Sequence, residues 1–484
     1  MINCCLMNSL HLKSIQNKIV DAIGADGMEF LLHTKNYFTA TLLLKGIYFL
    51  TIPIFTSLLT PADYGILGIY TSLVSIFTVL IGLNFDSATI RYFYEDQDDY
   101  EDFIRSVYWF VTVIGVFCIV LIYIFRNAIA IYFNVEEDIV LYAVLVPFFN
   151  HSFMMYLSTM QAKRQSKRYS QLVLLQRLSS LALTILVIYL MTNDRYLGRI
   201  YMELLTAGIS FLLFLRYFGK KYTFHWRYIK YAANIAIPLI PHVLSSFIMS
   251  YFARIIINKV DGSASAGIFS LADDVGAIMM VVSMSFNKSW TPIFYQKMND
   301  NDVIGIRKQS ARIIKYTALI AVFLIFFSRE IVLLVANDRY LAALAIVPPI
   351  ILGKAFGPLY TIYSHVTDYY KKMIAISITT IAVGIFNIFL NSIFIPEYGV
   401  IAGAYTSMTC SILLFVFHYV TARYIIGSKV LLLRPMLTPY IWVVLAIVFY
   451  LWGVENIESL LLFILIKVTF LVLIFIAFFK ARIV

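Results

Sequence analysis

Long apolar stretches alternate with short polar connections along almost the whole chain of 484 residues. Most of the stretches are about 20 residues long, the length at which an α-helix crosses the hydrocarbon core of a membrane. Because lipid cannot satisfy backbone polar groups, runs of this length indicate helices. The pattern therefore predicts an all-α polytopic membrane protein with about 14 transmembrane helices. The predicted helices lie at residues 37–59, 65–90, 106–126, 139–161, 170–191, 198–218, 231–258, 266–287, 309–328, 343–365, 373–395, 400–424, 437–454 and 457–479.

The first polar break lies within LLTPADYGILGIYTS at residues 58–72. Thr60 to Asp63 interrupt the apolar run, and Gly65 precedes its continuation. Proline and aspartate favour tight turns, and glycine accepts backbone angles that other residues avoid. The pattern predicts a turn over these residues, with the helix restarting at Gly65.

Similar stretches recur later in the chain. YGVIAGAYTS at residues 398–407 resembles YGILGIYTS at residues 64–72, and AGIFSLADD at residues 266–274 is a weaker copy. This spacing predicts two pseudo-symmetric six-helix lobes, an arrangement that many transporters share; convergent turn chemistry is the alternative. The predicted parts are an N-terminal segment at 1–36, helices 1–6 at 37–218, helices 7–12 at 231–424 and a last helix pair at 437–480.

Prolines lie inside the first and seventh apolar stretches, at Pro53 and at Pro238 and Pro241. Proline removes a backbone hydrogen bond and clashes with the preceding helical turn, so both helices are predicted to be interrupted. In transporters built from repeats, broken helices at corresponding positions line the ligand site.

The composition agrees with a membrane protein, since 61% of the residues are hydrophobic and 13% are charged. With the amino terminus placed in the cytoplasm, most of the 38 Lys and Arg residues fall in cytoplasmic connections. This asymmetry predicts that both termini are cytoplasmic, in a multi-pass protein of the cytoplasmic membrane. The net charge of +11 follows from that topology, so we predict no nucleic-acid partner.

Three cations lie well inside apolar stretches: Lys45, Arg254 and Lys354. Each would cost about 2.5–3.5 kcal/mol if it faced lipid at the middle of a helix. Such residues normally face the bundle interior or a wet cavity. An excess of cations there would suit an anionic ligand, because arginine binds phosphate through two hydrogen bonds and lysine supplies a point charge.

Acidic groups accompany these cations. Asp86 ends the second stretch, with Arg91 following, and Asp273 and Asp274 lie below the turn that opens the eighth stretch. Two interpretations remain open: the acids neutralise the cations in purely structural pairs, or they serve ion coupling in a cationic cavity. His242 is intramembrane and could titrate near neutral pH, although hydrogen-bonded packing is the simpler role.

Motifs of common enzyme and metal sites are missing from the sequence. It has no GxxxxGK[ST] loop, no HExxH and no CxxC, so we predict no cofactor and no metal. The run EDQDDYED at 95–102 contains a formal DxD pattern, but a solvated charge run explains it better. A membrane glycan polymerase would carry its chemistry on a large outer loop, which the sequence lacks.

Several of these stretches resemble one family. TPADYGILGIYTS followed by LNFDSATIRYFYE is similar to the first hairpin of polysaccharide-type oligosaccharide flippases, members of the multidrug/oligosaccharidyl-lipid/polysaccharide exporter superfamily. IPLIPHVLSSFIMSYFARIIINKV with FNKSWTPIFY resembles their seventh and eighth helices, and NSIFIPEYGVIAGAYTS resembles their eleventh and twelfth. The resemblance covers roughly residues 37–424.

The resemblance implies two lobes around a central cationic cavity. It implies a transporter, not an enzyme, that moves polyprenyl-diphosphate-linked oligosaccharides to the outer leaflet for surface polysaccharides such as O-antigen. Lys45 and Arg254 match basic cavity positions, and Asp86 and Arg91 match the end of the second helix. Many members have an acid before the arginine that matches Arg254, where this chain has Ala253. That departure leaves the arginine without an adjacent counter-ion.

The implied partners are the lipid-linked oligosaccharide, membrane lipids, a polysaccharide polymerase and glycosyltransferases. Two other functions remain open: a multidrug or metabolite antiporter of the same fold, and a membrane glycan polymerase.

Overall fold

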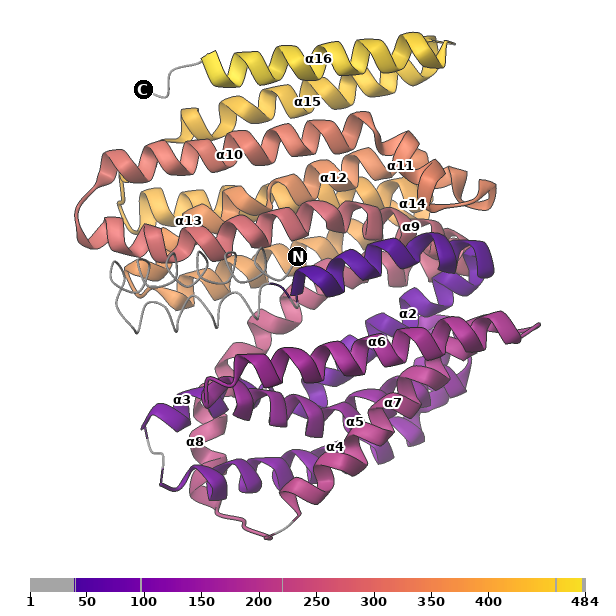
Figure 1. The fold of residues 1–484 in the computed structure, drawn as a ribbon, viewed down its shortest axis with the longest axis vertical. Coiled ribbons are helices and arrows are strands. Elements are labelled where there is room, and N and C mark those ends of the chain that lie inside the picture. Colours follow the sequence, from indigo (N-terminus) through magenta and orange to yellow (C-terminus); the bar gives the residue numbers. More distant parts are fainter. Residues whose placement is uncertain (1–38, 40, 96–97, 220, 458, 481–484) are drawn as a thin grey trace, which may run out of the picture.

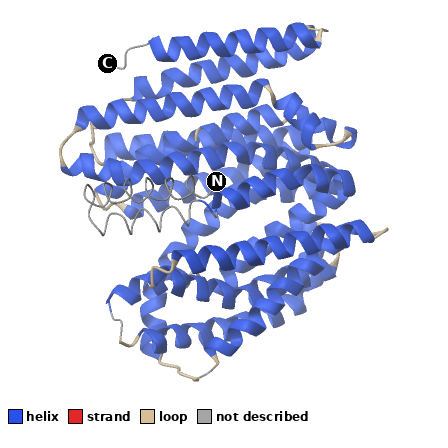
Figure 2. Ribbon diagram, viewed as in Figure 1, coloured by secondary structure: helices blue, strands red, loops and turns tan. Residues whose placement is uncertain are grey.

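The described part of the chain is entirely helical apart from turns and loops, with no strand among the described residues (Figures 1 and 2). The structure is a computed structural model, and it describes residues 39, 41–95, 98–219, 221–457 and 459–480. The prediction of an all-α protein is confirmed. The predicted segment 1–36 lies outside the described residues.

The helices follow one another with short connections. Those of the first half are Thr41–Leu58, α2 (Pro61–Gly82), α3 (Asp86–Glu95), α4 (Tyr100–Phe133), α5 (Glu137–Ala162), α6 (Ser166–Leu190), α7 (Arg195–Phe218) and α8 (Trp226–Ala236). Those of the second half are η1 (Ile237–Leu239), α9 (Ile240–Asn299), α10 (Val303–Phe326), α11 (Ser328–Val335), η2 (Asp338–Ala345), α12 (Val347–Ala355), α13 (Gly357–Tyr369), α14 (Met373–Val420), η3 (Thr421–Ile425), α15 (Leu433–Asn456) and α16 (Leu460–Lys480).

Within the described residues, 11 helices are long and apolar enough to cross a membrane, or 12 if one bent pair counts as a single span. Two of the spans are too long for one crossing. The span Trp226–Asn299 has 74 residues, which would make a straight helix about 110 Å long. It breaks at Gly262 (φ 82°), and α14 breaks at Gly399 (φ 61°). Only glycine adopts such angles easily. Each of these two long spans therefore divides into two crossings, which agrees with the prediction of about 14 crossings.

The helix α2 begins earlier than the sequence pattern predicts. Thr60 accepts a hydrogen bond from the backbone N–H of Asp63, and the Asp63 carboxylate accepts one from the backbone N–H of Thr60. This capping box satisfies the first free donors of the helix, and Pro61 suits its first position. The predicted turn over Thr60 to Asp63 is therefore wrong: these residues cap the helix and form its first turn.

The two proline predictions have opposite outcomes. The helix Thr41–Leu58 continues through Pro53 without a break, so the predicted interruption there is wrong. At Pro238 the chain forms the 3₁₀ segment η1 between α8 and α9, which confirms the second break. The prolines of the tenth predicted helix stand at the starts of α12 and α13, where the missing N–H costs nothing.

The helices form two groups in space (Figure 1). Helices α2 to α8 lie in one group, and α9 to α16 lie in the other, with α2 packed closely against α9 where the groups meet. The helix Thr41–Leu58, the indigo ribbon in Figure 1, lies along the second group. Helices α15 and α16 lie at the margin of the second group beside α10. The exact lobe boundaries and the internal repeat stay predictions.

The acidic run after α3 is bound to basic residues and to α8. Arg227 of α8 pairs with Asp99, and Tyr231 donates a hydrogen bond to Glu95. Lys163 pairs with Glu101 at 2.9 Å. These contacts hold α8 to the first group, so the chain passes from one group to the other at η1.

Asp302 fixes the start of α10 through two contacts. Its carboxylate accepts hydrogen bonds from Lys297 at 2.6 Å and from the backbone N–H of Gly305 at 2.8 Å. The Lys297 bond, followed by the Gly305 bond, holds the pKa of the Asp302 carboxyl below its ordinary value. The stabilisation is therefore present above the pKa of the unfolded chain, and is lost as the pH falls through the lower folded pKa.

Candidate functional site

Three charged side chains meet where the two groups of helices face each other. Lys354 of α12 lies 2.7 Å from Asp273 Oδ1, and Arg254 of α9 lies 3.5 Å from Asp273 Oδ2. Arg254 and Asp273 stand on opposite sides of the break at Gly262, so the reversal of the chain brings them together. We call Arg254, Asp273 and Lys354 the charge cluster. It carries two cations for one anion.

Arg254 is the most deeply placed member of the charge cluster. Its side chain is 6% exposed, against 28% for Asp273 and 24% for Lys354. The guanidinium lies 5.6 Å from the centre of the Tyr251 ring, and its Nε is buried with no hydrogen-bond partner in the described part of the chain. A buried guanidinium with an unused N–H can accept a further anionic partner.

Two glycines make room for the cations. A Cβ at Gly68 of α2 would lie 2.8 Å from Arg254 Cδ, and a Cβ at Gly276 of α9 would lie 3.1 Å from Lys354 Cε. Any larger residue at these positions would push the side chains of the cluster aside. Gly68 also shows that α2 from the first group packs directly on Arg254 from the second.

A second acid beside the cluster bonds to α2 of the first group and to the first helix. Asp274 accepts a hydrogen bond from Tyr64 of α2 at 2.6 Å and one from Tyr48 of the first helix at 3.2 Å. Hydrogen bonds to a charged acceptor are stronger than neutral ones. The neighbouring acids thus have different partners: Asp273 pairs with cations of α9 and α12, while Asp274 accepts hydrogen bonds from tyrosines of α2 and the first helix.

The groups are sealed together at one end of the bundle, which we call the glycine end because Gly65, Gly262, Gly267 and Gly399 lie there. A Cβ at Gly65 would lie 1.8 Å from the carbonyl oxygen of Ser263, and a Cβ at Gly267 would lie 1.8 Å from that of Pro61. Backbones can approach this closely only where both helices have glycine. Gly65 is needed for this contact, and not to restart the helix.

Hydrogen bonds extend the seal at the glycine end. Asn258 donates from Nδ2 to the carbonyl oxygens of Phe133 and Asn134, at 2.7 and 3.0 Å. Asn134 donates back to the carbonyl oxygen of Asn258 at 3.1 Å. Thr56 of the first helix donates to the carbonyl oxygen of Val335 at 2.7 Å. The positive-inside prediction puts this end on the outer side of the membrane.

Lys45 lies one turn from Tyr48, in a groove away from the charge cluster. The groove runs between the first helix and α9 and also contains Lys288. Neither ammonium group forms an ion pair with a carboxylate of the described residues. Lys288 directly follows the eighth predicted stretch at 266–287, and only the packing of the two helices shows that it lines the same groove as Lys45.

The structure separates Arg91 and Asp86 from the charge cluster. Arg91 is exposed on α3, where it pairs with Glu95 at 2.7 Å. Asp86 is the first residue of α3, after Leu83 and Asn84 have turned the chain with positive φ angles. Acids are favourable in the first turn of a helix, which gives Asp86 a local structural role.

His242 stands in the first turn of α9, and its Nδ1 is buried without a hydrogen-bond partner among the described residues. The structure therefore brings together Arg254, Lys354, Asp273 and Asp274 from the predicted site, and leaves Lys45, Arg91, Asp86 and His242 outside the cluster. Tyr48 and Tyr64 were not predicted from the sequence, since a tyrosine in an apolar stretch gives no signal of its partner. Their roles in binding stay predictions.

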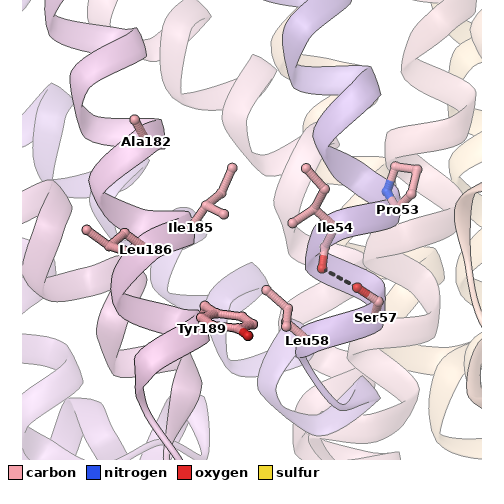
Figure 3. A pocket seen from close by; sticks show the side chains of 8 residues that line it. All are labelled: Pro53, Ile54, Ser57, Leu58, Ala182, Ile185, Leu186 and Tyr189. Atoms are coloured by element: carbon pink, nitrogen blue, oxygen red, sulfur yellow. Dashed lines mark hydrogen bonds between the residues drawn. The ribbon is translucent and has the colours of Figure 1, made fainter.

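An apolar groove of about 570 Å³ opens between the first helix and α6. Figure 3 shows Ile54 and Leu58 on one wall and Ile185, Leu186 and Tyr189 on the other. No charged residue lines this groove. Its described lining is suited to apolar contact.

No group of three or more His, Cys, Asp or Glu side chains within the described ranges is arranged to hold a metal ion.

Comparison with known proteins identifies the family. A family model described as "Polysaccharide biosynthesis protein" matches residues 34–298, which is more than half of the chain. The chain belongs to the polysaccharide biosynthesis protein family. The matched residues include the first helix and α2 to α8, and they reach to the end of α9. The resemblance found in the sequence is confirmed.

Two relatives from Haemophilus influenzae are similar at the level of sequence. "Lsg locus putative protein 1" is 23% identical over 55% of this chain and 66% of its own length. An "Uncharacterized membrane protein" is 23% identical over 57% of this chain and 68% of its own length. The alignments thus span about two thirds of these relatives.

Solved transporter structures share the fold. The "Lipid II flippase MurJ, inward closed conformation" covers 91% of this chain and 97% of its own, with a TM-score of 0.71 and 17% identity. The inward-facing conformation of a multidrug resistance MATE family transporter covers 80% and 96%, with a TM-score of 0.60 and 15% identity. The protein has the fold of a membrane transporter of the MOP superfamily.

Proposed function

We propose that the protein flips polyprenyl-diphosphate-linked oligosaccharide repeat units from the inner to the outer leaflet of the cytoplasmic membrane, for surface polysaccharide biosynthesis. The membership of the polysaccharide biosynthesis family supports this proposal. No covalent bond changes in the transport step, so the protein would act as a transporter and not as an enzyme.

The charge cluster is the observation that carries the proposal. Two cations converge on one carboxylate between the two groups of helices, and Arg254 is almost fully buried there. A diphosphate offers several oxygens at similar spacing. The guanidinium can bind two of them in its plane, and the Lys354 ammonium can bind another as a point charge.

Alternating access would move the bound diphosphate across the membrane. The seal between the groups at the glycine end consists of hydrogen bonds and close helix contacts, which can separate without breaking a covalent bond. In this state the protein would receive substrate from the cytoplasmic side, because the glycine end is closed. The polyprenyl tail would remain in lipid.

A flipping assay with arginine variants tests the proposal. We expect Arg254→Gln to lose about 90% or more of the transport of a fluorescent lipid-linked oligosaccharide in proteoliposomes, since one buried charged hydrogen bond contributes about 1.5–3 kcal/mol. Arg312→Gln is the matched control, because Arg312 is exposed on α10 away from the cluster. Full transport by the Arg254 variant at wild-type protein levels would remove this residue from the mechanism.

A multidrug or metabolite antiporter of the same fold is the second candidate. The acids Asp273 and Asp274 between the groups favour it, because carboxylates suit a cationic drug or a coupling ion. The two functions predict ligands of opposite charge: an anionic diphosphate lipid for the flippase and a cationic compound for the antiporter. Export of cationic dyes from cells, with no flipping of a diphosphate lipid, would establish the antiporter instead.

A further inference from the structure

We infer that Asp273 is an internal competitor that occupies the place of the substrate diphosphate until the substrate displaces it. This inference rests on the proposed function and names the residue that sets the strength of binding at the same site. Asp273 would be a positioning and release residue, since it binds the cations of the cluster and not the substrate.

The geometry of the carboxylate supports this role. Its two oxygens contact different cations, with Oδ1 at 2.7 Å from Lys354 Nζ and Oδ2 at 3.5 Å from the Arg254 guanidinium. Two oxygens of a diphosphate would make the same pair of contacts. The carboxylate and the diphosphate therefore cannot both hold the two cations in the arrangement seen here.

The exposure of the three side chains indicates that Arg254 is the one held in place. Asp273 is 28% exposed and Lys354 is 24% exposed, whereas Arg254 is 6% exposed and packed against Gly68 of α2. The partly exposed carboxylate of Asp273 would therefore move aside more easily than the buried guanidinium. An incoming diphosphate would thus exchange with the carboxylate while the guanidinium stays in position.

This exchange has consequences for both binding and release. Buried cations without a counter-ion are unfavourable, so removal of Asp273 should increase their attraction for a diphosphate. After transport, the returning carboxylate would neutralise the cations and help expel the product. A site that binds its substrate too tightly releases it slowly, and transport needs both steps.

The experiment compares the wild-type protein with Asp273→Asn. The probe is a polyprenyl diphosphate without sugar, and its Kd is measured in detergent by native mass spectrometry. We expect Asp273→Asn to bind about tenfold more tightly, since coupling within close charge pairs starts near a factor of ten. We also expect its maximal flipping rate in proteoliposomes to fall. Asp98→Asn is the control, because Asp98 is exposed between α3 and α4.

A second comparison keeps the inference testable if Asp273→Asn alone folds poorly. Lys354→Met leaves Arg254 neutralised by Asp273, and the double variant Asp273→Asn/Lys354→Met leaves only one unneutralised cation. The double variant should bind the probe more tightly than Lys354→Met. If Asp273 had only a structural role, Asp273→Asn would bind the probe more weakly than the wild-type protein, and the double variant would bind it more weakly than Lys354→Met.

The outcomes separate the inference from the proposed function. If the wild-type protein binds the probe and neither Asp273→Asn comparison shows tighter binding, the inference is wrong and the proposed function stands. If the wild-type protein binds no diphosphate lipid, the proposed function fails and the inference falls with it.

Discussion

At the scale of single residues, the role of a charged side chain in an apolar stretch depends on which group it pairs with. Ala253 leaves Arg254 without an acid beside it in the sequence, and this suggested a free guanidinium. The structure supplies Asp273 from the other side of the Gly262 break as its counter-ion. Of the two open interpretations, structural pairing describes the arrangement of Asp273, while binding of an anion at the cluster stays a prediction.

Lys45 and Lys288 give a prediction at this scale. Because both lysines line one groove between the first helix and α9, a diphosphate that enters this groove would meet both ammonium groups. We expect Lys45→Gln and Lys288→Gln each to raise the half-saturating substrate concentration about fivefold with little change in maximal rate, as exposed ion pairs contribute about 1 kcal/mol or less. Initial flipping rates at several substrate concentrations measure this.

The control for these lysines is Lys297→Gln, because Lys297 already pairs with Asp302 at 2.6 Å. A fall in maximal rate without a change in half-saturation would contradict a binding role for the groove.

At the scale of elements, the last helix is fastened by one buried ion pair. Lys467 of α16 is 0% exposed and lies 2.8 Å from Glu330 of α11. Its ammonium also lies 4.1 Å from the centre of the Phe463 ring, a favourable cation–π arrangement. Glu330 is far from Lys467 along the chain, so this pair could not be recognised from the neighbours of Lys467 in the sequence. The pair attaches α16 to the second group.

This ion pair yields a stability prediction. Glu330→Gln leaves a buried ammonium without its counter-ion, which should lower the free energy of unfolding by about 3 kcal/mol. The double variant Glu330→Gln/Lys467→Met removes both charges and should recover most of that loss. Thermal unfolding in detergent measures both variants. A double variant no more stable than Glu330→Gln would show that the charges do not interact.

At the scale of the whole molecule, the seal at the glycine end decides which side is open. Its closest contacts need glycine on both helices, since a Cβ at Gly65 would collide with Ser263 at 1.8 Å. Gly65→Val should prevent the closure seen here and lower transport severely. Chemical cross-linking of Asn134→Cys with Asn258→Cys, which lie across the seal, should fall in yield.

Gly208→Ala is the control for the seal, because a Cβ at Gly208 meets no atom within 4 Å. Undiminished cross-linking in the Gly65→Val background would contradict the close contact between α2 and α9.

The sequence by itself determined the helices, because the length and apolarity of a membrane-crossing segment are local properties of the chain. The charged positions Arg254, Asp273 and Lys354 were also visible, since polar groups are rare in such segments. The sequence located the boundaries between helices less accurately. The capping box of Thr60 and Asp63 uses the same residue types as a turn, so the start of α2 was predicted too late.

Only the tertiary structure decided which residues meet. The contact of Asp273 with Arg254 depends on the reversal at Gly262, and the bonds of Tyr48 and Tyr64 to Asp274 depend on the packing of the two groups. The groove of Lys45 and Lys288 arises in the same way. Partnership between distant residues is set by how helices pack, and the apolar pattern of one helix contains no information about the side chains of its neighbour.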